Sequence, residues 1–140
     1  MRGRSTIVVL TVTALAVAVF SAFSAVALAT TRTLHLTAVV YEHSSKGGVY
    51  ASKEKVFEGA TRVGEDSSRC TAISHSQTRC VGSYTLKQGN ITFSGTITIG
   101  DNTNRLAIVG GTGAYKDARG TVLTEYNSAG NRAKETLTFK

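Results

Sequence analysis

The sequence predicts an all-β fold for most of this chain. Apolar and polar residues alternate with a period of two over several segments, which is typical of strands with one buried face. Short segments rich in glycine, asparagine and serine separate these runs, proline is absent, and no segment shows a clear helical period. Strands of five to nine residues joined by short turns indicate an antiparallel meander, either closed into a barrel or folded as a sandwich.

The strands are expected in the following order along the chain. Clear alternation occurs at residues 34–41, 80–86 and 91–99, and further β-rich runs lie at 105–109, 121–126 and 135–139. Hairpin turns are expected at 87–90, 100–104 and 127–130, and a longer flexible loop at 44–48. The least regular stretch, 52–68, contains four of the nine acidic residues. We expect it to hold one short strand near 55–58 and an exposed loop.

The first 29 residues have the pattern of a secretory signal peptide. Arg2 and Arg4 precede an almost wholly apolar run at residues 7–20, and Ala27-Leu28-Ala29 matches the small-residue site of signal peptidase. We therefore expect cleavage after Ala29, secretion without membrane attachment, and one domain over residues 30–140. The alternative is an uncleaved N-terminal membrane anchor, because the uncharged stretch is long enough to span a bilayer.

The charge pattern argues against a nucleic-acid partner. The formal charge of the chain is +7, and removal of residues 1–29, which contain Arg2 and Arg4 and no acid, leaves +5. The remaining basic residues are scattered singly, whereas nucleic-acid binding needs a clustered basic stripe. The sequence therefore predicts a soluble, mildly basic surface.

Cys70 and Cys80 are the only cysteines, and we expect them to form a disulfide. Oxidising compartments preserve such bonds. Residues 71–79 would form a hairpin between the two cysteines, in which a directly opposed, non-hydrogen-bonded pair brings the Cβ atoms close enough to bridge. No metal site is expected, because neither CxxC nor HxxxH spacing occurs and the three histidines are far apart.

A glycine-rich tract at residues 108–120 has the composition of a nucleotide-binding loop but not its spacing. A P-loop needs GxxxxGK[ST], whereas Lys116 is followed by Asp117, and the third glycine of a GxGxxG turn is missing after Gly113. Only six residues separate Gly113 from the next glycine, which leaves no room for the helix that would bind phosphate. We expect a tight bend or bulge between two strands at 110–113.

Glu42 is the candidate catalytic residue. It continues the parity of the apolar positions in 34–40, so it would point into one mouth of a barrel whose interior that face lines. A carboxylate in an apolar lumen has a raised pKa and can act as acid or base. The alternative is a strand-end glutamate turned to solvent. The nucleophile motif G-x-S-x-G is absent.

Three motifs resemble segments of the allene oxide cyclase and dirigent protein superfamily. The tract VGGTGAYKDARG at 109–120 resembles the dirigent sequence VVGGTGxFRxARG and the related TGGSGxFxGAxG of allene oxide cyclases. The segment RCVGSY at 79–84 is similar to the dirigent GRAQGxY, and VYE at 40–42 is similar to the end of the first cyclase strand. Their order and spacing match across residues 34–140.

The resemblance implies an eight-stranded antiparallel β-barrel, commonly trimeric, that handles small hydrophobic molecules without a metal or cofactor. It implies Glu42 as the cyclase glutamate and Arg79 and Arg119 as ligand-binding arginines. Tyr84 and Phe93 lie on apolar strand faces and are expected to form the wall of the lumen, the alternative being ordinary core residues. The chain departs from both patterns. It has Ser44 at the position of a cyclase asparagine, and it lacks the dirigent His-Asp pair at the end of the first strand.

We therefore expect a secreted barrel that binds a small hydrophobic ligand and steers a cyclisation, isomerisation or coupling mainly by orientation. The signal sequence and the short chain suggest a bacterial secreted member of the superfamily. The alternative is a non-enzymatic secreted lipid carrier or surface interaction protein.

Overall fold

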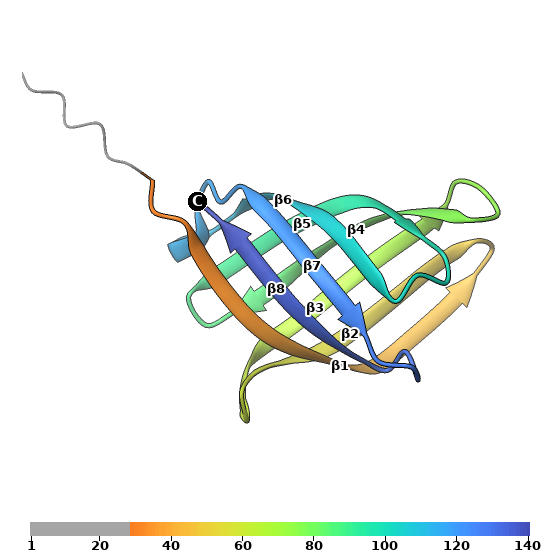
Figure 1. Cartoon of the computed structure of the whole chain (residues 1–140), viewed down its shortest axis with the longest axis horizontal. Coiled ribbons are helices and arrows are strands. Elements are labelled where there is room, and N and C mark those ends of the chain that lie inside the picture. The colour runs from red at the N-terminus through yellow and green to blue at the C-terminus, as the bar shows by residue number, and fades with distance from the viewer. Residues whose placement is uncertain (1–28) are drawn as a thin grey trace, which may run out of the picture.

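Eight antiparallel strands close into a barrel in the computed structural model, which describes residues 29–140 (Figure 1). β1 pairs with β2 on one side and with β8 on the other, so the sheet has no free edge. The predicted eight-stranded barrel is confirmed. The predicted signal peptide lies, apart from Ala29, outside the described residues. Within residues 29–140, no helix has the length and hydropathy needed to cross a membrane.

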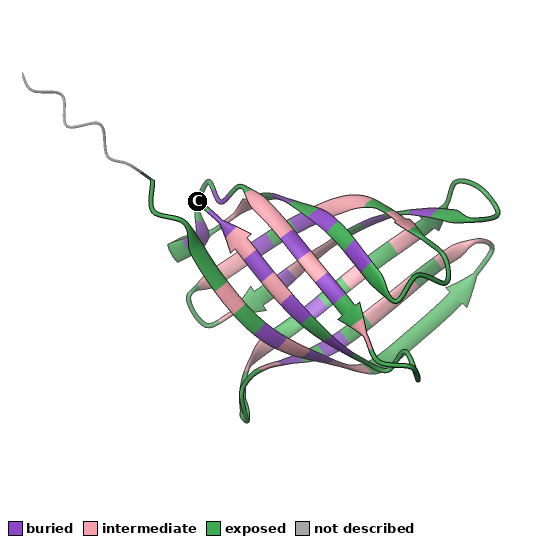
Figure 2. Cartoon of the chain, in the orientation of Figure 1, coloured by how far each residue is buried: buried purple, intermediate pink, exposed green. Residues whose placement is uncertain are grey.

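The strands follow one another around the barrel in chain order. They are β1 (Arg32–Lys46), β2 (Val49–Glu58), β3 (Thr61–Ala72), β4 (Gln77–Leu86), β5 (Gly89–Thr98), β6 (Thr103–Gly111), β7 (Gly120–Tyr126) and β8 (Arg132–Phe139). One turn of 3-10 helix, η1 (Gly113–Tyr115), connects β6 to β7. Buried residues alternate with intermediate or exposed ones along the strands, as the banding of β7 and β8 shows (Figure 2).

Inward side chains fill the part of the barrel nearest η1 and the C-terminus with an apolar core. Its buried members are Leu36, Val56, Tyr84, Ile91, Phe93, Leu106, Ile108, Tyr115, Ala118, Val122, Leu137 and Phe139. Each fully buried side chain of this size contributes about 1.5–3 kcal/mol of transfer free energy. This half of the interior is therefore mostly a packed core. A cavity of about 310 Å³ lies at its edge, lined by Leu34, Leu36, Val63, Leu86 and Tyr115 among others.

The glycine tract forms the predicted bend between two strands. β6 ends at Gly111, where a Cβ would lie 2.3 Å from the carbonyl oxygen of Tyr115, and Gly113 has a φ of +58°. Close backbone approach and a left-handed conformation are the two conditions under which glycine is required. The bend places Tyr115 edge-on against Phe139, and Arg32 stacks over both rings at 5.3 Å. The tract thus covers one end of the barrel.

Two segments are more regular than the sequence indicates. Residues 52–68 lie almost wholly in β2 and β3, with only the turn at Gly59 and Ala60 between these strands, and β1 continues through most of the expected 44–48 loop. Both strands are mainly polar along these stretches. Their β structure comes from cross-strand hydrogen bonding around the closed sheet. The local pattern of apolar residues does not indicate this hydrogen bonding.

The predicted disulfide is present. Cys70 on β3 lies directly opposite Cys80 on β4, with their Cα atoms 4.0 Å apart. The short Cα–Cα distance identifies a non-hydrogen-bonded pair, as expected for a bridge across a hairpin. The bond joins two neighbouring strands on the inner face of the barrel, where Cys80 is buried.

Replacing both cysteines by serine should lower the free energy of unfolding by about 2–3 kcal/mol, because the small loop that the bond closes in the unfolded chain is released. Urea denaturation of the Cys70→Ser/Cys80→Ser variant against the oxidised wild type measures the difference. A thiol assay that found two free thiols in the purified wild-type protein would contradict the pairing.

Candidate functional site

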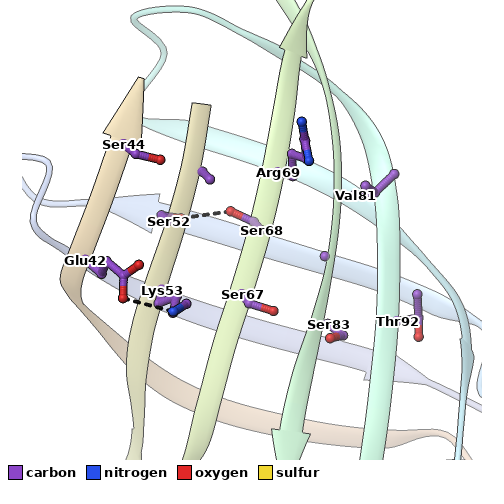
Figure 3. A pocket seen from close by; sticks show the side chains of 12 residues that line it. Glu42, Ser44, Ser52, Lys53, Ser67, Ser68, Arg69, Val81, Ser83 and Thr92 are labelled. Atoms are coloured by element: carbon purple, nitrogen blue, oxygen red, sulfur yellow. Dashed lines mark hydrogen bonds and ion pairs between the residues drawn. The ribbon is translucent and has the colours of Figure 1, made fainter. Parts of the chain in front are cut away.

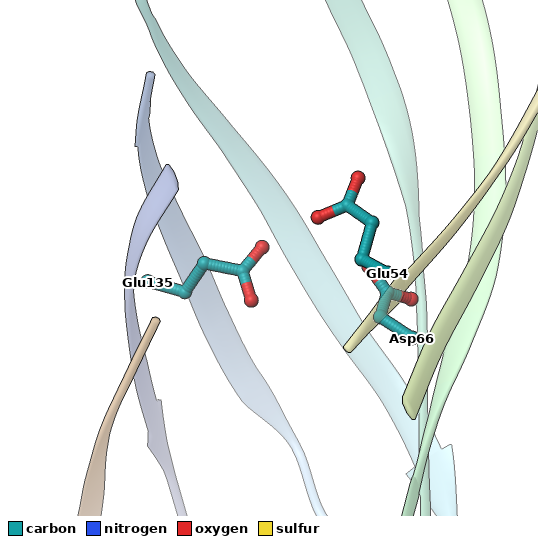
Figure 4. Close-up of side chains that lie close together, drawn as sticks. All are labelled: Glu54, Asp66 and Glu135. Carbon is teal, nitrogen blue, oxygen red and sulfur yellow. The ribbon is translucent and has the colours of Figure 1, made fainter. Parts of the chain in front are cut away.

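Three carboxylic acids from three strands meet inside the barrel. Glu54 on β2 lies directly opposite Asp66 on β3, and Glu135 reaches in from β8. One carboxylate oxygen from each residue lies within 4.8 Å of the others. Glu135 points toward Glu54 and Asp66 (Figure 4). The three residues, called the acid cluster below, are only 4–5% exposed.

Cross-strand register places the acid cluster in a polar layer of the interior. Asp66 pairs with Tyr84 on β4. Glu135 pairs with Thr124 on β7, and Thr124 in turn pairs with Asn104 on β6. All five residues are buried. Buried polar groups in such a position normally make hydrogen bonds to one another or to a bound molecule.

The hydrogen bonding of the acid cluster is incomplete. Ser52 donates to Glu54 Oε1 over 3.4 Å, and Thr124 donates to Glu135 Oε1 over 3.5 Å. Both distances are long for a bond between two oxygens. The buried atoms Asp66 Oδ1 and Glu135 Oε2 have no partner at all. Leaving a buried acceptor without a donor costs about 1–3 kcal/mol, so these atoms mark a place where the fold alone does not satisfy its polar groups.

Burial shifts the acid cluster toward its protonated form. Removal from water, and then repulsion from Glu135 and Glu54, raises the pKa of Asp66 to about 9. Burial, and then the charge of Glu54, raises the pKa of Glu135 to about 8, although the neighbouring hydroxyl groups of Tyr84 and Thr124 oppose the shift. Burial also raises the pKa of Glu54. Carboxyl groups tuned in this way are characteristic of functional sites.

No basic side chain neutralises the acid cluster within the part of the chain that the structure describes. Every lysine and arginine of residues 29–140 is exposed. The two ion pairs found there, Lys53–Glu42 and Arg62–Glu65, lie outside the lumen and involve other acids. The interior therefore carries three ionisable acids without a counterion, and protons or a bound cation must supply the missing positive charge.

Two adjacent cavities lie beside the acid cluster. The inner one, about 40 Å³, is lined by all three acids together with Tyr84, Phe93 and the disulfide. The outer one, about 450 Å³ and called the mouth cavity below, lies at the end of the barrel opposite η1. Their shared lining residues are Glu54, Ser68, Cys70, Ile97, Asn104 and Tyr126. The mouth cavity also contacts Val40, Tyr50 and Ile99, so an apolar and aromatic vestibule lies above an acidic floor.

Glu42 does not point into the lumen, and the expectation of an inward side chain is wrong. Val40 pairs with Glu54 whereas Glu42 pairs with Lys53, so Tyr41 is the extra residue of a β-bulge. An extra residue reverses the parity of the strand beyond it. Glu42 therefore lies on the outer face, where its carboxylate, 58% exposed, accepts a hydrogen bond from Lys53 Nζ at 2.9 Å.

Glu42 and Lys53 line a groove of about 530 Å³ outside the lumen (Figure 3). Ser67, Ser83 and Thr92 supply hydroxyl groups along it. Its two facing charges neutralise each other and remain in contact with water. An exposed ion pair of this kind is worth little energetically, and the groove has none of the desolvation that tunes the acid cluster.

The same bulge brings His43 to the mouth cavity. His43 pairs with Ser52, whose side chain is also on the inner face, and both residues line the mouth. Without the bulge, alternation along β1 would turn Glu42 inward and His43 outward. With the bulge, His43 takes the inward position instead of Glu42. The imidazole is the only histidine side chain that lines the described lumen.

The other predicted site residues divide into two groups. Tyr84 and Phe93 are buried in the lumen below the acid cluster, with ring centroids 5.2 Å apart. Arg79 and Arg119 are exposed, and neither lines a lumen cavity. Arg119 donates instead to the carbonyl oxygen of its neighbour Ala118 at 2.8 Å. The structure thus brings the two aromatic residues to the site and leaves both arginines and Glu42 outside it.

Sequence reasoning missed the acid cluster, although a signal was present. Glu135 shares the parity of Ala133, Leu137 and Phe139, which places a carboxylate on an apolar strand face. Glu54 has the same relation to Val56. Asp66 offers no such signal, since its flanking positions are polar, and only its pairing with Glu54 reveals it.

The sequence places the chain in a known family. Residues 28–134 match the family model described as "Allene oxide cyclase barrel like domain", and the chain belongs to this family. No curated protein gives a significant match.

Solved structures with the same fold include enzymes and dirigent proteins. A pyocyanin demethylase superimposes with a TM-score of 0.68 at 19% identity, covering 78% of this chain and 100% of its own. Two pterocarpan synthase dirigent proteins give TM-scores of 0.57 and 0.56 at 18% and 16% identity, covering 79% of this chain in both cases and 83% and 94% of their own. At these identities the similarity establishes the fold alone. The family match over residues 28–134 confirms the predicted membership among allene oxide cyclase-like barrels.

The raised pKa values predict a pH-dependent stability. Asp66 and Glu135 titrate near 9 and 8 in the folded protein, against ordinary values of 3.8 and 4.5. The folded state therefore holds protons that the unfolded chain releases above about pH 4. The contribution of these two groups to the free energy of unfolding should therefore fall as pH rises from about 4 to about 8 for Glu135 and to about 9 for Asp66. The fall is at most about 1.4 kcal/mol per pH unit for each group.

Urea denaturation between about pH 5 and pH 9 measures this dependence. The Glu135→Gln variant keeps the shape of the side chain but cannot ionise, so its stability should fall less steeply with pH than that of the wild type. Glu125→Gln, on the exposed face of neighbouring β7, is the matched control and should keep the wild-type slope. Parallel curves for all three proteins would contradict the shifted pKa of Glu135.

Proposed function

We propose that this protein binds a small, largely apolar molecule in its lumen and acts on it by proton transfer through the acid cluster. The observation that carries the proposal is the position of three carboxyl groups with raised pKa values beneath an apolar vestibule. Ligand sites in proteins commonly combine an apolar cavity with a few convergent polar groups. The mouth cavity, at about 450 Å³, has the size of such sites.

The acid cluster is suited to general acid–base catalysis. With pKa values of about 9 and 8, Asp66 and Glu135 hold protons near neutral pH and can donate them to an oxygen or a carbon of the ligand. An apolar site that keeps a carboxylic acid neutral also allows it to donate a hydrogen bond to developing negative charge. Once deprotonated, the same group is a base. This chemistry is that of an isomerisation or a cyclisation, in which a proton is moved and no group is lost.

The wider comparison supports small-molecule chemistry in this barrel. One matched structure is named for the demethylation of pyocyanin and two for pterocarpan synthesis. Export is part of the proposal: the Cys70–Cys80 bond is suited to an oxidising compartment, and the N-terminal residues have the signal-peptide pattern. The homotrimer implied by the resemblance stays a prediction, which sizing of the protein in solution tests.

Ligand binding is tested with N-phenyl-1-naphthylamine, a neutral fluorophore that brightens in apolar surroundings. The purified wild type should give saturable fluorescence. Ile97→Trp fills the vestibule from a residue that lines both cavities and should weaken binding at least about tenfold. Val81→Trp adds the same ring to the outer groove and should change nothing. Loss of binding in Val81→Trp alone would move the ligand to the outer groove and refute the proposal.

Catalysis is tested on any compound that the protein converts. Glu135→Gln should lower the rate by about 10²–10⁴-fold, because it removes a proton donor from the reacting ligand. Glu42→Gln, which changes an exposed carboxylate on the outer face, should retain the wild-type rate. A protein that binds ligands but converts none of them, with unchanged affinity in Glu135→Gln, would instead be a carrier.

A further inference from the structure

The acid cluster has the number and the spacing of acceptors that suit an alkylammonium group. Such a group carries three N–H donors and no acceptor. Three acceptors that each lie about 2.8 Å from one tetrahedral nitrogen are about 4.6 Å apart. The carboxylate oxygens of Glu54, Asp66 and Glu135 lie within 4.8 Å of one another. Two of these groups also have a buried oxygen, Asp66 Oδ1 and Glu135 Oε2, that no donor in the protein reaches.

The size of the inner cavity limits what can occupy it. Its volume of about 40 Å³ has room for an ammonium group or a few waters but not for a whole organic molecule. The inner cavity lies against the mouth cavity and shares six lining residues with it, so a molecule held in the inner cavity by its head would extend its body toward the mouth. The body would lie between Tyr50, Tyr126 and Ile97.

The interior has no cation of its own to pair with an ionised acid. No lysine or arginine within residues 29–140 is buried, so any of the three acids that loses its proton lacks an internal counterion. An anionic or purely apolar head would leave the orphan oxygens unpaired.

We propose that the lumen takes a small organic amine, whose ammonium group sits between Glu54, Asp66 and Glu135 and whose apolar body fills the mouth cavity. The inference rests on the proposed function, since both place a ligand in the lumen, and it adds the chemical class of that ligand. The ammonium group would donate to all three carboxyl groups, including the two orphan oxygens.

Binding of the amine should release protons. The acid cluster holds protons near neutral pH, and an incoming ammonium ion favours the charged carboxylates, so at least one proton leaves to the buffer. The titratable groups that face the cluster are Tyr84 on β4 and Tyr126 on β7, with His43 on β1 and Asp101 at the mouth. Burial raises the pKa of both tyrosines further above their ordinary value, so they remain protonated.

A matched pair of probes tests the proposal on the protein purified from expression of the full chain. Benzylamine is an ammonium ion at neutral pH, and ethylbenzene has the same shape with a methyl group in place of the ammonium. Calorimetry should show benzylamine binding at least about tenfold more tightly. Titration in two buffers of different ionisation enthalpy should show proton release with benzylamine and none with ethylbenzene.

Variants locate the binding group. Glu135→Gln and Asp66→Asn keep the side-chain shape and should each weaken benzylamine binding about tenfold or more while leaving ethylbenzene unaffected. Glu125→Gln, exposed on β7, should bind both probes like the wild type. Thermal melts establish that each variant is folded. The proton release is measured on the wild type, so that test does not depend on the folding of any variant.

Three results would overturn the inference. Equal affinities for benzylamine and ethylbenzene would show a lumen that takes apolar ligands without recognising a cation, which leaves the proposed function intact. Tight binding of Ca²⁺ or Mn²⁺ that displaces benzylamine would show that the acid cluster is a metal site. Failure of both probes and of the neutral fluorophore to bind would refute the proposed function together with the inference.

Discussion

The hydrogen-bonded pairing of β1 with β8 is the constraint on which the rest of the structure depends. It closes the sheet, so that eight strands of alternating pattern enclose an interior instead of presenting a solvated face. Half of that interior is filled by apolar side chains, and η1 with Tyr115 covers its end. The remaining half is not filled: the acid cluster is buried in it, and the mouth cavity beyond has exposed residues in its lining. Desolvation of the acids, their raised pKa values and the cavities all follow from this closure.

The acid cluster destabilises a fold whose other inward positions are mostly apolar. Three carboxyl groups on inward positions oppose folding above neutral pH, and two of their oxygens lack donors. Apolar residues at the same positions would make a more stable barrel. Proteins tolerate such exceptions chiefly where function requires them. The disulfide on the neighbouring strands β3 and β4 stabilises the same part of the wall from which Asp66 projects.

Glu42 and the acid cluster show how far the inward or outward direction of a side chain can be predicted from alternation along a strand. Parity is reliable for as long as a strand pairs without interruption, and it correctly places Tyr84 and Phe93 in the lumen. A single bulge at Tyr41 moves Glu42 outside and His43 inside. Nothing in the residues around Tyr41 distinguishes a bulge from a regular strand, because the extra residue is defined by the partner strand. The same limitation applies to Asp66, whose neighbours along β3 are polar.

The sequence by itself determined the all-β class and most of the strands, the glycine bend before β7, the pairing of Cys70 with Cys80 and the family. Each of these depends on residues close together in the chain or on a motif with fixed spacing. Only the tertiary structure decided the site. Glu54, Asp66 and Glu135 come from β2, β3 and β8, and they meet because closure and the stagger between strands place them at one level of the barrel. That level is a property of the whole ring of strands, so no single segment of the sequence contains it.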